Sequence, residues 1–191
     1  TNPGTFQTVI GVEVDSGNNI YVSSLDHRVQ KFNSATTFLG WLGNAVAGWQ
    51  TTAGAGPSSG SANGHLYSPQ SIAFDSRNSM YVTDMNNNRI QKFDASGNFI
   101  LAWGGSGSRN GQFNSPKGIA IDSSDNVYIA DSQNNRIQVF STNGTFIGKF
   151  GMTGTANAQF VQPSQIDCDS SGNLYIADKS NHRVQVFAPA P

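Results

Sequence analysis

The chain has 191 residues, of which 21 are glycine and 12% are charged, and its formal net charge is −1 at pH 7. A nearly neutral chain has no general field that attracts nucleic acid or an anionic membrane, so we expect neither as a partner. No run approaches the roughly 18 apolar residues of a membrane-spanning helix, which predicts no membrane insertion.

Short runs with alternating apolar residues follow one another along the chain, and they recur. The first run of each copy ends in an aspartate, and these aspartates are Asp15, Asp75, Asp122 and Asp169. The third copy contains the runs GIAID, NVYIAD, RIQVF and TFIGKF, separated by short polar turns. An alternation of period two indicates β-strands, and the turns join them into a four-stranded antiparallel sheet. Such a unit cannot bury both faces alone, so its repetition predicts a β-propeller.

In chain order, we predict a single all-β domain over residues 1–191 with four repeats. Blade 1 covers about 8–43, a linker insertion 44–65, blade 2 about 68–105, blade 3 about 115–152 and a partial blade 4 about 162–188. The fourth repeat reaches Phe187 without an outer strand, so the last blade is expected to lack one. Three interpretations stay open: a fragment of a longer propeller, a homo-oligomer whose protomers complete a ring together, and a four-bladed ring.

The thirteen-residue segments Tyr128–Phe140 and Tyr175–Phe187 read YIADSQNNRIQVF and YIADKSNHRVQVF, and they resemble NHL repeats. Tyr81–Phe93 matches as well, whereas Tyr21–Phe32 is one residue shorter and has Ser24 in place of the repeat's aspartate. The resemblance spans essentially the whole chain and implies an NHL-type propeller. NHL domains serve as extracellular sensors, protein-interaction platforms or RNA readers, and the balanced charge of this chain disfavours the last role.

An aspartate and an arginine recur five residues apart in three of the repeats, as Asp84 and Arg89, Asp131 and Arg136, and Asp178 and Arg183. A catalytic pair is needed once, whereas a pair in each blade indicates a structural ion pair that braces the fold. The aspartates that end the first runs precede turn residues, so we expect them to accept turn amides.

Three residues are candidates for binding. Glu13 and Asp167 stand where the middle repeats have alanine on an inner strand, so they could bind a cation near the channel or act as acid and base. The alternative is that they contact channel water or cap an irregular first and last blade. Trp49 lies in the insertion and is costly to leave in water, which favours docking on a blade or a partner. Trp41, Trp103 and Phe150 fall at equivalent places on outer strands.

No metal or cofactor is expected. The related amidating lyases hold zinc with a histidine that follows the proline of an inner strand, and the matching positions here include Gln70, Lys117 and Ser164, which cannot serve. His27 and His182 occupy the position before the repeat arginine and are interpreted as turn residues. No nucleophile elbow or phosphate-binding loop is present.

These observations predict a non-enzymatic binding or scaffold module for a protein, peptide or glycan, within a larger extracellular protein or assembly. A composition rich in asparagine, serine, threonine and glycine favours an extracellular or cell-surface location. The alternatives are a lyase or lactonase-type enzyme with a channel metal, and an assembly subunit that uses the open blade edge. Asn143 begins an Asn-Gly-Thr sequence that is either a glycosylation acceptor or simply a hairpin turn.

Overall fold

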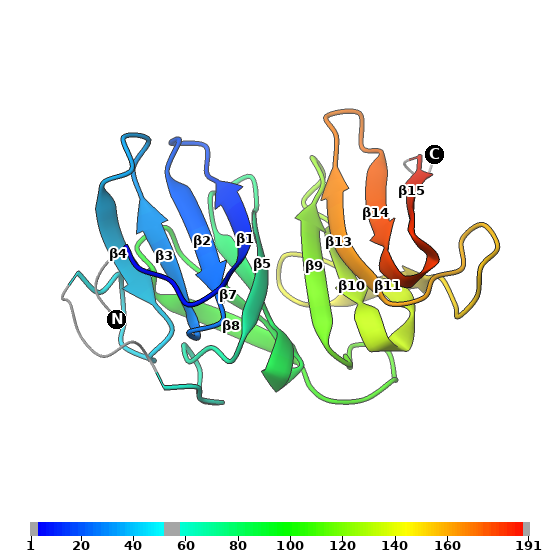
Figure 1. Cartoon of the computed structure of the whole chain (residues 1–191), viewed down its shortest axis with the longest axis horizontal. Coiled ribbons are helices and arrows are strands. Elements are labelled where there is room, and N and C mark those ends of the chain that lie inside the picture. The colour runs from blue at the N-terminus through cyan, green and yellow to red at the C-terminus, as the bar shows by residue number, and fades with distance from the viewer. Residues whose placement is uncertain (1–3, 52–57, 189–191) are drawn as a thin grey trace.

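The structure, a computed structural model, describes residues 4–51 and 58–188. These residues form four antiparallel sheets, which are the blades of a β-propeller, so the predicted all-β fold is confirmed (Figure 1). Residues 52–57 of the predicted insertion lie outside the described ranges. No helix of the described residues has the length and apolar character needed to cross a membrane.

The strands lie within the four ranges expected from the repeats. Blade 1 contains β1 (Val9–Val14), β2 (Ile20–Ser24), β3 (Arg28–Phe32) and β4 (Phe38–Leu42). Blade 2 contains β5 (Pro69–Phe74), β6 (Met80–Asp84), η1 (Met85–Asn87), β7 (Arg89–Phe93) and β8 (Phe99–Gly104). Blade 3 contains β9 (Pro116–Ile121), β10 (Val127–Asp131), η2 (Ser132–Asn134), β11 (Arg136–Phe140) and β12 (Phe146–Phe150). Blade 4 contains β13 (Pro163–Cys168), β14 (Leu174–Asp178), η3 (Lys179–Asn181) and β15 (Arg183–Phe187), and it lacks a fourth strand, as predicted.

The turn between the first two strands of each blade is closed by an aspartate. In blade 2 the Asp75 carboxylate accepts the backbone N–H groups of Arg77 at 3.0 Å and Ser79 at 2.8 Å. Asn78 adopts a left-handed conformation with φ of 60°, which asparagine tolerates well. The same arrangement recurs at Asp15, Asp122 and Asp169, so the predicted acceptance of turn amides is confirmed.

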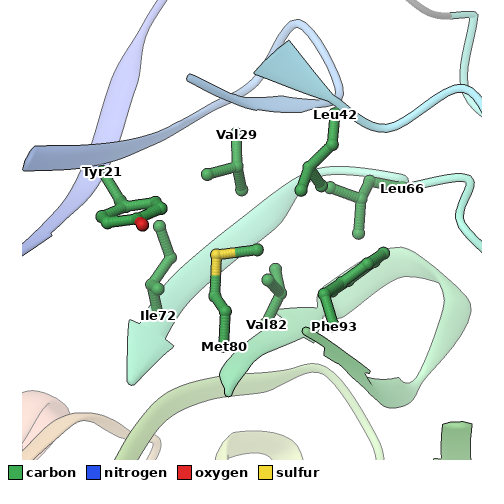
Figure 2. Packing of buried hydrophobic residues seen from close by; sticks show 8 residues of the cluster. All are labelled: Tyr21, Val29, Leu42, Leu66, Ile72, Met80, Val82 and Phe93. Carbon is green, nitrogen blue, oxygen red and sulfur yellow. The ribbon is translucent and has the colours of Figure 1, made fainter. Parts of the chain in front are cut away.

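The core consists of three layers between successive blades. We call the side of a blade that faces the following blade its trailing face, and the opposite side its leading face. Figure 2 shows the first layer, in which Tyr21, Val29 and Leu42 from blade 1 meet a group from blade 2 and its linker: Leu66, Ile72, Met80, Val82 and Phe93. The later layers repeat this arrangement, so each internal face is covered by the next repeat.

The first strands of the blades, β1, β5, β9 and β13, lie next to one another in chain order. Two pairs of them, β9 with β13 and β1 with β5, approach closely because a glycine at the contact has no side chain. A Cβ atom at Gly118 would lie 2.7 Å from the carbonyl oxygen of Ser164 and from the Ile166 nitrogen, and one at Gly11 would lie 2.5 Å from the Gln70 carbonyl oxygen. These contacts bring the four inner strands together around one concave surface.

Candidate functional site

A hollow with a volume of about 660 Å³ lies on the concave side of the inner strands. Equivalent positions of the four strands contribute Glu13, Ala73, Ala120 and Asp167 to its lining. Each of these residues pairs across the sheet with the tyrosine of the second strand, namely Tyr21, Tyr81, Tyr128 and Tyr175. The hollow therefore has small apolar side chains at its centre and a carboxylate on each flank.

Glu13 is a half-buried carboxylate with few partners. Its Oε1 atom accepts the backbone N–H of Val14 at 3.2 Å. Burial raises the pKa of Glu13; the Val14 N–H lowers it, and the negative charge of Asp167 raises it again, leaving a net increase. The structure therefore places both acids in the lining of one hollow.

Asp167 lies on the opposite flank and is exposed. Its Oδ1 atom accepts the backbone N–H of Cys168 at 2.8 Å. Within the described residues, neither Glu13 nor Asp167 forms an ion pair. Two carboxylates that share a hollow and have no cation beside them can receive a positively charged group from a ligand.

Cys168 also lines the hollow, but its chemistry is that of a packing residue. Its Sγ atom lies 3.0 Å from the Ile121 carbonyl oxygen, to which the thiol donates. Burial raises the pKa of the thiol, and neighbouring carboxylates led by Asp167 raise it further. A thiol with a raised pKa is a poor nucleophile at neutral pH.

No histidine lies among the residues that line the hollow. His27 accepts the Ser68 N–H at its Nδ1 atom over 3.2 Å and contacts the Tyr67 ring, and His182 follows η3 in a left-handed conformation. Across residues 4–51 and 58–188, no three His, Cys, Asp or Glu side chains gather as a metal site would require. Two carboxylates are fewer ligands than a dedicated zinc or calcium site uses.

The recurring aspartates and arginines are brought together away from the hollow. Asp131 is fully buried, and its Oδ2 atom lies 2.7 Å from Arg136 Nε. The same oxygen accepts from the side chains of Asn134 at 2.9 Å and Gln138 at 3.0 Å, while Oδ1 accepts the Asn114 N–H at 2.8 Å. We call this arrangement a brace, in which both oxygens of the carboxylate accept hydrogen bonds.

Each brace also ties down the linker that enters its blade. The remaining guanidinium nitrogens of Arg136 donate to the carbonyl oxygens of Ser108, Arg109 and Gln112 at 2.8 to 2.9 Å. The same contacts recur at Arg89 and Arg183 with their own linkers. The geometry supports the structural interpretation of all three pairs.

Blade 1 has a different brace, which the repeat pattern did not predict. Arg28 Nε lies 2.7 Å from Asp26 Oδ2, and both side chains are buried. The Ser24 hydroxyl contacts the other oxygen of Asp26, and an Arg28 nitrogen donates to the Thr5 carbonyl oxygen at 2.5 Å. The aspartate has moved two residues along the chain, so its spacing from the arginine differs from that of the other repeats.

Trp49 is held by contacts within the chain. Its Nε1 atom donates to the Ala95 carbonyl oxygen at 3.2 Å, and its ring centroid lies 5.5 Å from that of Tyr21. Lys31 Nζ lies 5.4 Å from the same ring, a cation–π contact. These contacts favour a packing role between blades 1 and 2 over a ligand-binding role for Trp49.

The register corrects one predicted equivalence on the outer strands. It pairs Leu42 with Val29, Trp103 with Ile90, and Phe150 with Ile137. Leu42 is therefore the equivalent of Trp103, and Trp41 lies one position away. The interval from Val29 to Leu42 is as long as that from Ile90 to Trp103, so the prediction was one residue out of register, and one residue changes the face of a strand to which a side chain belongs.

Sequence reasoning missed a hydrogen bond that recurs in every blade. The tyrosine of the second strand donates its hydroxyl to the turn aspartate six residues earlier, as in Tyr128 to Asp122 at 3.0 Å. Burial, and then the bond to this carboxylate, raises the pKa of Tyr128 to about 12. The constant spacing of six residues between aspartate and tyrosine is the signal that could have revealed it.

Comparison with known structures supports the fold. A protein of unknown function from Bacteroides thetaiotaomicron VPI-5482 is 16% identical, with a TM-score of 0.68 over 94% of this chain and 47% of the other. A streptogramin B lyase is 12% identical, with a TM-score of 0.67 over 100% of this chain and 57% of the lyase. An auxiliary nutrient binding protein from the same Bacteroides strain is 16% identical, with a TM-score of 0.65 over 94% of this chain and 47% of the binding protein. The chain thus spans about half the length of these proteins, and such low identities show the fold alone.

Comparison with curated protein sequences finds no match. The family model described as NHL repeat matches residues 66–93, 113–140 and 160–187. Each of these three segments covers the end of a linker and the first three strands of blade 2, 3 or 4. Together with the four blades of the structure, they show that the chain is an NHL-repeat β-propeller.

Proposed function

We propose that the chain is a binding module whose hollow holds a basic segment of a protein or peptide partner. An NHL-type propeller supports a binding or scaffold role in general. The observation that carries the specific proposal is the pair of carboxylates, Glu13 and Asp167, which flank an alanine-lined centre and form no ion pair with any residue of 4–51 and 58–188.

Lysine and arginine side chains match such a surface because they combine an apolar stem with a cationic head. The stem would lie against Ala73 and Ala120, and the head would reach the carboxylates. A cation near Glu13 would also offset the burial and the Asp167 charge that raise the pKa of its carboxyl. A neutral glycan can donate hydroxyl groups to the carboxylates but brings no positive charge to offset theirs, so we favour a peptide over a glycan.

An enzymatic role receives less support. One structural neighbour is a streptogramin B lyase, but its identity of 12% carries the fold only. Another neighbour with the same fold is a nutrient binding protein, so the architecture does not choose between catalysis and binding. We retain an extracellular or cell-surface setting, within a larger protein or assembly, as part of the proposal. It rests on the composition of the chain.

The test uses an array of short synthetic peptides that vary in lysine and arginine content at constant length. The chain is expected to bind the basic members and not the acidic ones, and to bind more weakly as salt is raised, because mobile ions screen the attraction. The double variant Glu13→Gln/Asp167→Asn should weaken binding about tenfold, which corresponds to about 1.4 kcal/mol.

The matched control is Asp94→Asn/Asp125→Asn, which changes the net charge equally at turn residues that do not line the hollow. This control should bind the basic peptides nearly as well as the unaltered chain. Equal weakening in the two double variants would mean that only net charge matters, and the proposed site would be rejected.

A further inference from the structure

Blades 1 and 4 lie at the two ends of the row of blades, and each has one face that no blade covers (Figure 1). We propose that these two faces dock on each other between two copies of the chain, the trailing face of blade 4 against the leading face of blade 1. Two such contacts close a ring of two protomers. This inference concerns assembly and does not depend on the proposed peptide ligand.

The trailing face of blade 4 exposes apolar side chains, and one of them has an equivalent that is fully buried in each of the other blades. Val184 is 63% exposed, whereas the equivalent residues of blades 1 to 3, Val29, Ile90 and Ile137, are each 0% exposed. Tyr175 is 41% exposed, whereas Tyr21 is 1% exposed. Val186 beside them is 57% exposed. The face is built like the other trailing faces but has no blade against it.

The leading face of blade 1 is exposed in the same way. Val12 is 65% exposed, whereas its equivalents Ile72, Ile119 and Ile166 are 3 to 5% exposed because the preceding blade covers them. Val14 on the same strand is 49% exposed. Both ends of the row therefore present contiguous apolar side chains of the kind that proteins bury at interfaces.

The two open faces carry the two halves of an interface that the chain already forms internally. Between blades 3 and 4, Ile137 packs in one cluster with Phe160, Ile166 and Ile176. On the open face of blade 4, Val184 occupies the position of Ile137. On the open face of blade 1, the positions of Phe160, Ile166 and Ile176 are occupied by Phe6, Val12 and Val22. The ring contact of Phe6 is also equivalent to that of Phe160. The ring centroids of Phe6 and Phe32 are 6.0 Å apart, and those of Phe160 and Phe187 are 5.9 Å apart.

A second copy is the occupant that these observations favour, because the complementary face is present on the same chain. The contact is heterologous, and heterologous contacts close into a ring when the rotation allows it. Two chains of four blades supply eight, within the range of about 4 to 8 that propellers use. Asp167 on the docking face is compatible with this arrangement, since Glu13 holds the same position on a covered face and still lines the hollow.

The test is the mass of the 191-residue chain in solution, measured by light scattering at several concentrations without any peptide. A mass of two protomers is expected. A monomer at all concentrations would overturn the proposal, and an open-ended series of larger species would reject the ring of two.

Two variants identify the contact. Val184→Lys alters the blade 4 face and Val12→Lys the blade 1 face, and both residues also line the hollow, so the mass is measured without peptide. Each variant alone should be monomeric, because a charge is costly to bury without a partner. An equimolar mixture should regain part of the dimer, since one of its two contacts then joins unaltered faces. If Val12→Lys stays fully dimeric while Val184→Lys does not, blade 4 pairs with itself and the head-to-tail arrangement is wrong.

The control is Ile147→Lys, at a residue of β12 that is 56% exposed but lies on neither open face. It should remain dimeric. A monomeric Ile147→Lys would contradict the proposal that the dimer contact lies on the open faces of blades 1 and 4. Circular dichroism and thermal unfolding verify that each variant is folded. The mass of the unaltered chain decides the main question even if a variant fails to fold.

Discussion

Two sets of carboxylates in this propeller have opposite surroundings. The brace aspartates, such as Asp131, are fully buried and accept hydrogen bonds on both oxygens from an arginine, two amides and a backbone N–H. Glu13 and Asp167 are less buried, and each accepts a hydrogen bond from the backbone N–H of the next residue. The difference separates carboxylates whose bonding capacity is used by the fold from carboxylates that can still accept a ligand.

Position in the repeat explains this difference. A brace recurs in blades 2, 3 and 4, where each linker must be attached to its own blade. The acids of the hollow occur only in the first and last repeats, and the middle repeats have alanine in their place. Recurrence therefore indicates a structural role, whereas the departure from the repeat at Glu13 and Asp167 supports the binding site that we propose.

The largest expected effect comes from Asp131→Ala. The change leaves the nearly buried Arg136 without its anion, and breaking a buried ion pair in this way costs about 3–5 kcal/mol. Urea unfolding should show this loss as a lower midpoint at an unchanged slope. Asp167→Ala, the same substitution in the hollow, should change stability by no more than about 0.5 kcal/mol. Similar losses in the two variants would erase the distinction between the sets.

Asp178→Ala should have an intermediate effect. Its partner Arg183 has a side chain that is 28% exposed, compared with 8% for Arg136, so water replaces part of the lost interaction. We expect a loss on the order of 1–3 kcal/mol. Urea unfolding beside Asp131→Ala provides the comparison, and a larger loss for Asp178→Ala would contradict the dependence on burial.

The effect of Asp178→Ala should also depend on pH. Burial raises the pKa of Asp178, but hydrogen bonds from the Val161 N–H, Asn181, Arg183 and Gln185 outweigh it and hold the pKa below its ordinary value. A carboxyl whose pKa is depressed by folding stabilises the protein above the unfolded pKa of about 4, and this contribution is lost as the pH falls through the folded value. The difference between the unaltered chain and the variant should therefore shrink below pH 4. A difference that stays constant down to pH 2 would show that the charge of Asp178 is not the cause.

The smallest effect is expected for Glu13→Gln, and its sign is opposite. Folding raises the pKa of Glu13, so the folded state holds the proton more tightly and stability falls as the pH rises above about 4. At pH 7 the neutral glutamine should therefore stabilise the protein, by less than about 1 kcal/mol because the group is partly solvated. The gain should disappear at pH 3. Thermal unfolding at both pH values measures this gain in stability. A loss of stability at pH 7 would contradict the interpretation that the folded protein disfavours the charged form of Glu13.

Much of the fold could be predicted from the sequence because the same pattern of strand and turn residues recurs in each repeat. The strands, the turn aspartates and the pairs such as Asp131 and Arg136 all depend on residues close together in the chain. The brace of blade 1 escaped prediction because Asp26 lies two residues from Arg28, and that local geometry has no counterpart in the other repeats.

The hollow could be predicted only in part. The departure from alanine at Glu13 and Asp167 marks both residues in the sequence. Their approach to each other depends on the curvature of four stacked blades, and small rotations at three interfaces add up to that curvature. The packing of Trp49 against Tyr21 likewise depends on the path of the insertion, for which no other repeat gives a template.

The most direct test of the central claim is the pKa of Glu13, which is the only glutamate of the sequence. Labelling the carboxyl carbon of glutamate with ¹³C therefore gives one assigned NMR signal, whose shift can be followed against pH with and without a basic peptide. A shared site predicts a pKa of Glu13 above the ordinary value of about 4.3, and a decrease in that pKa both in Asp167→Asn and when the peptide is added. An ordinary pKa that neither change affects would contradict the claim that Glu13 and Asp167 form a shared site for a cationic ligand.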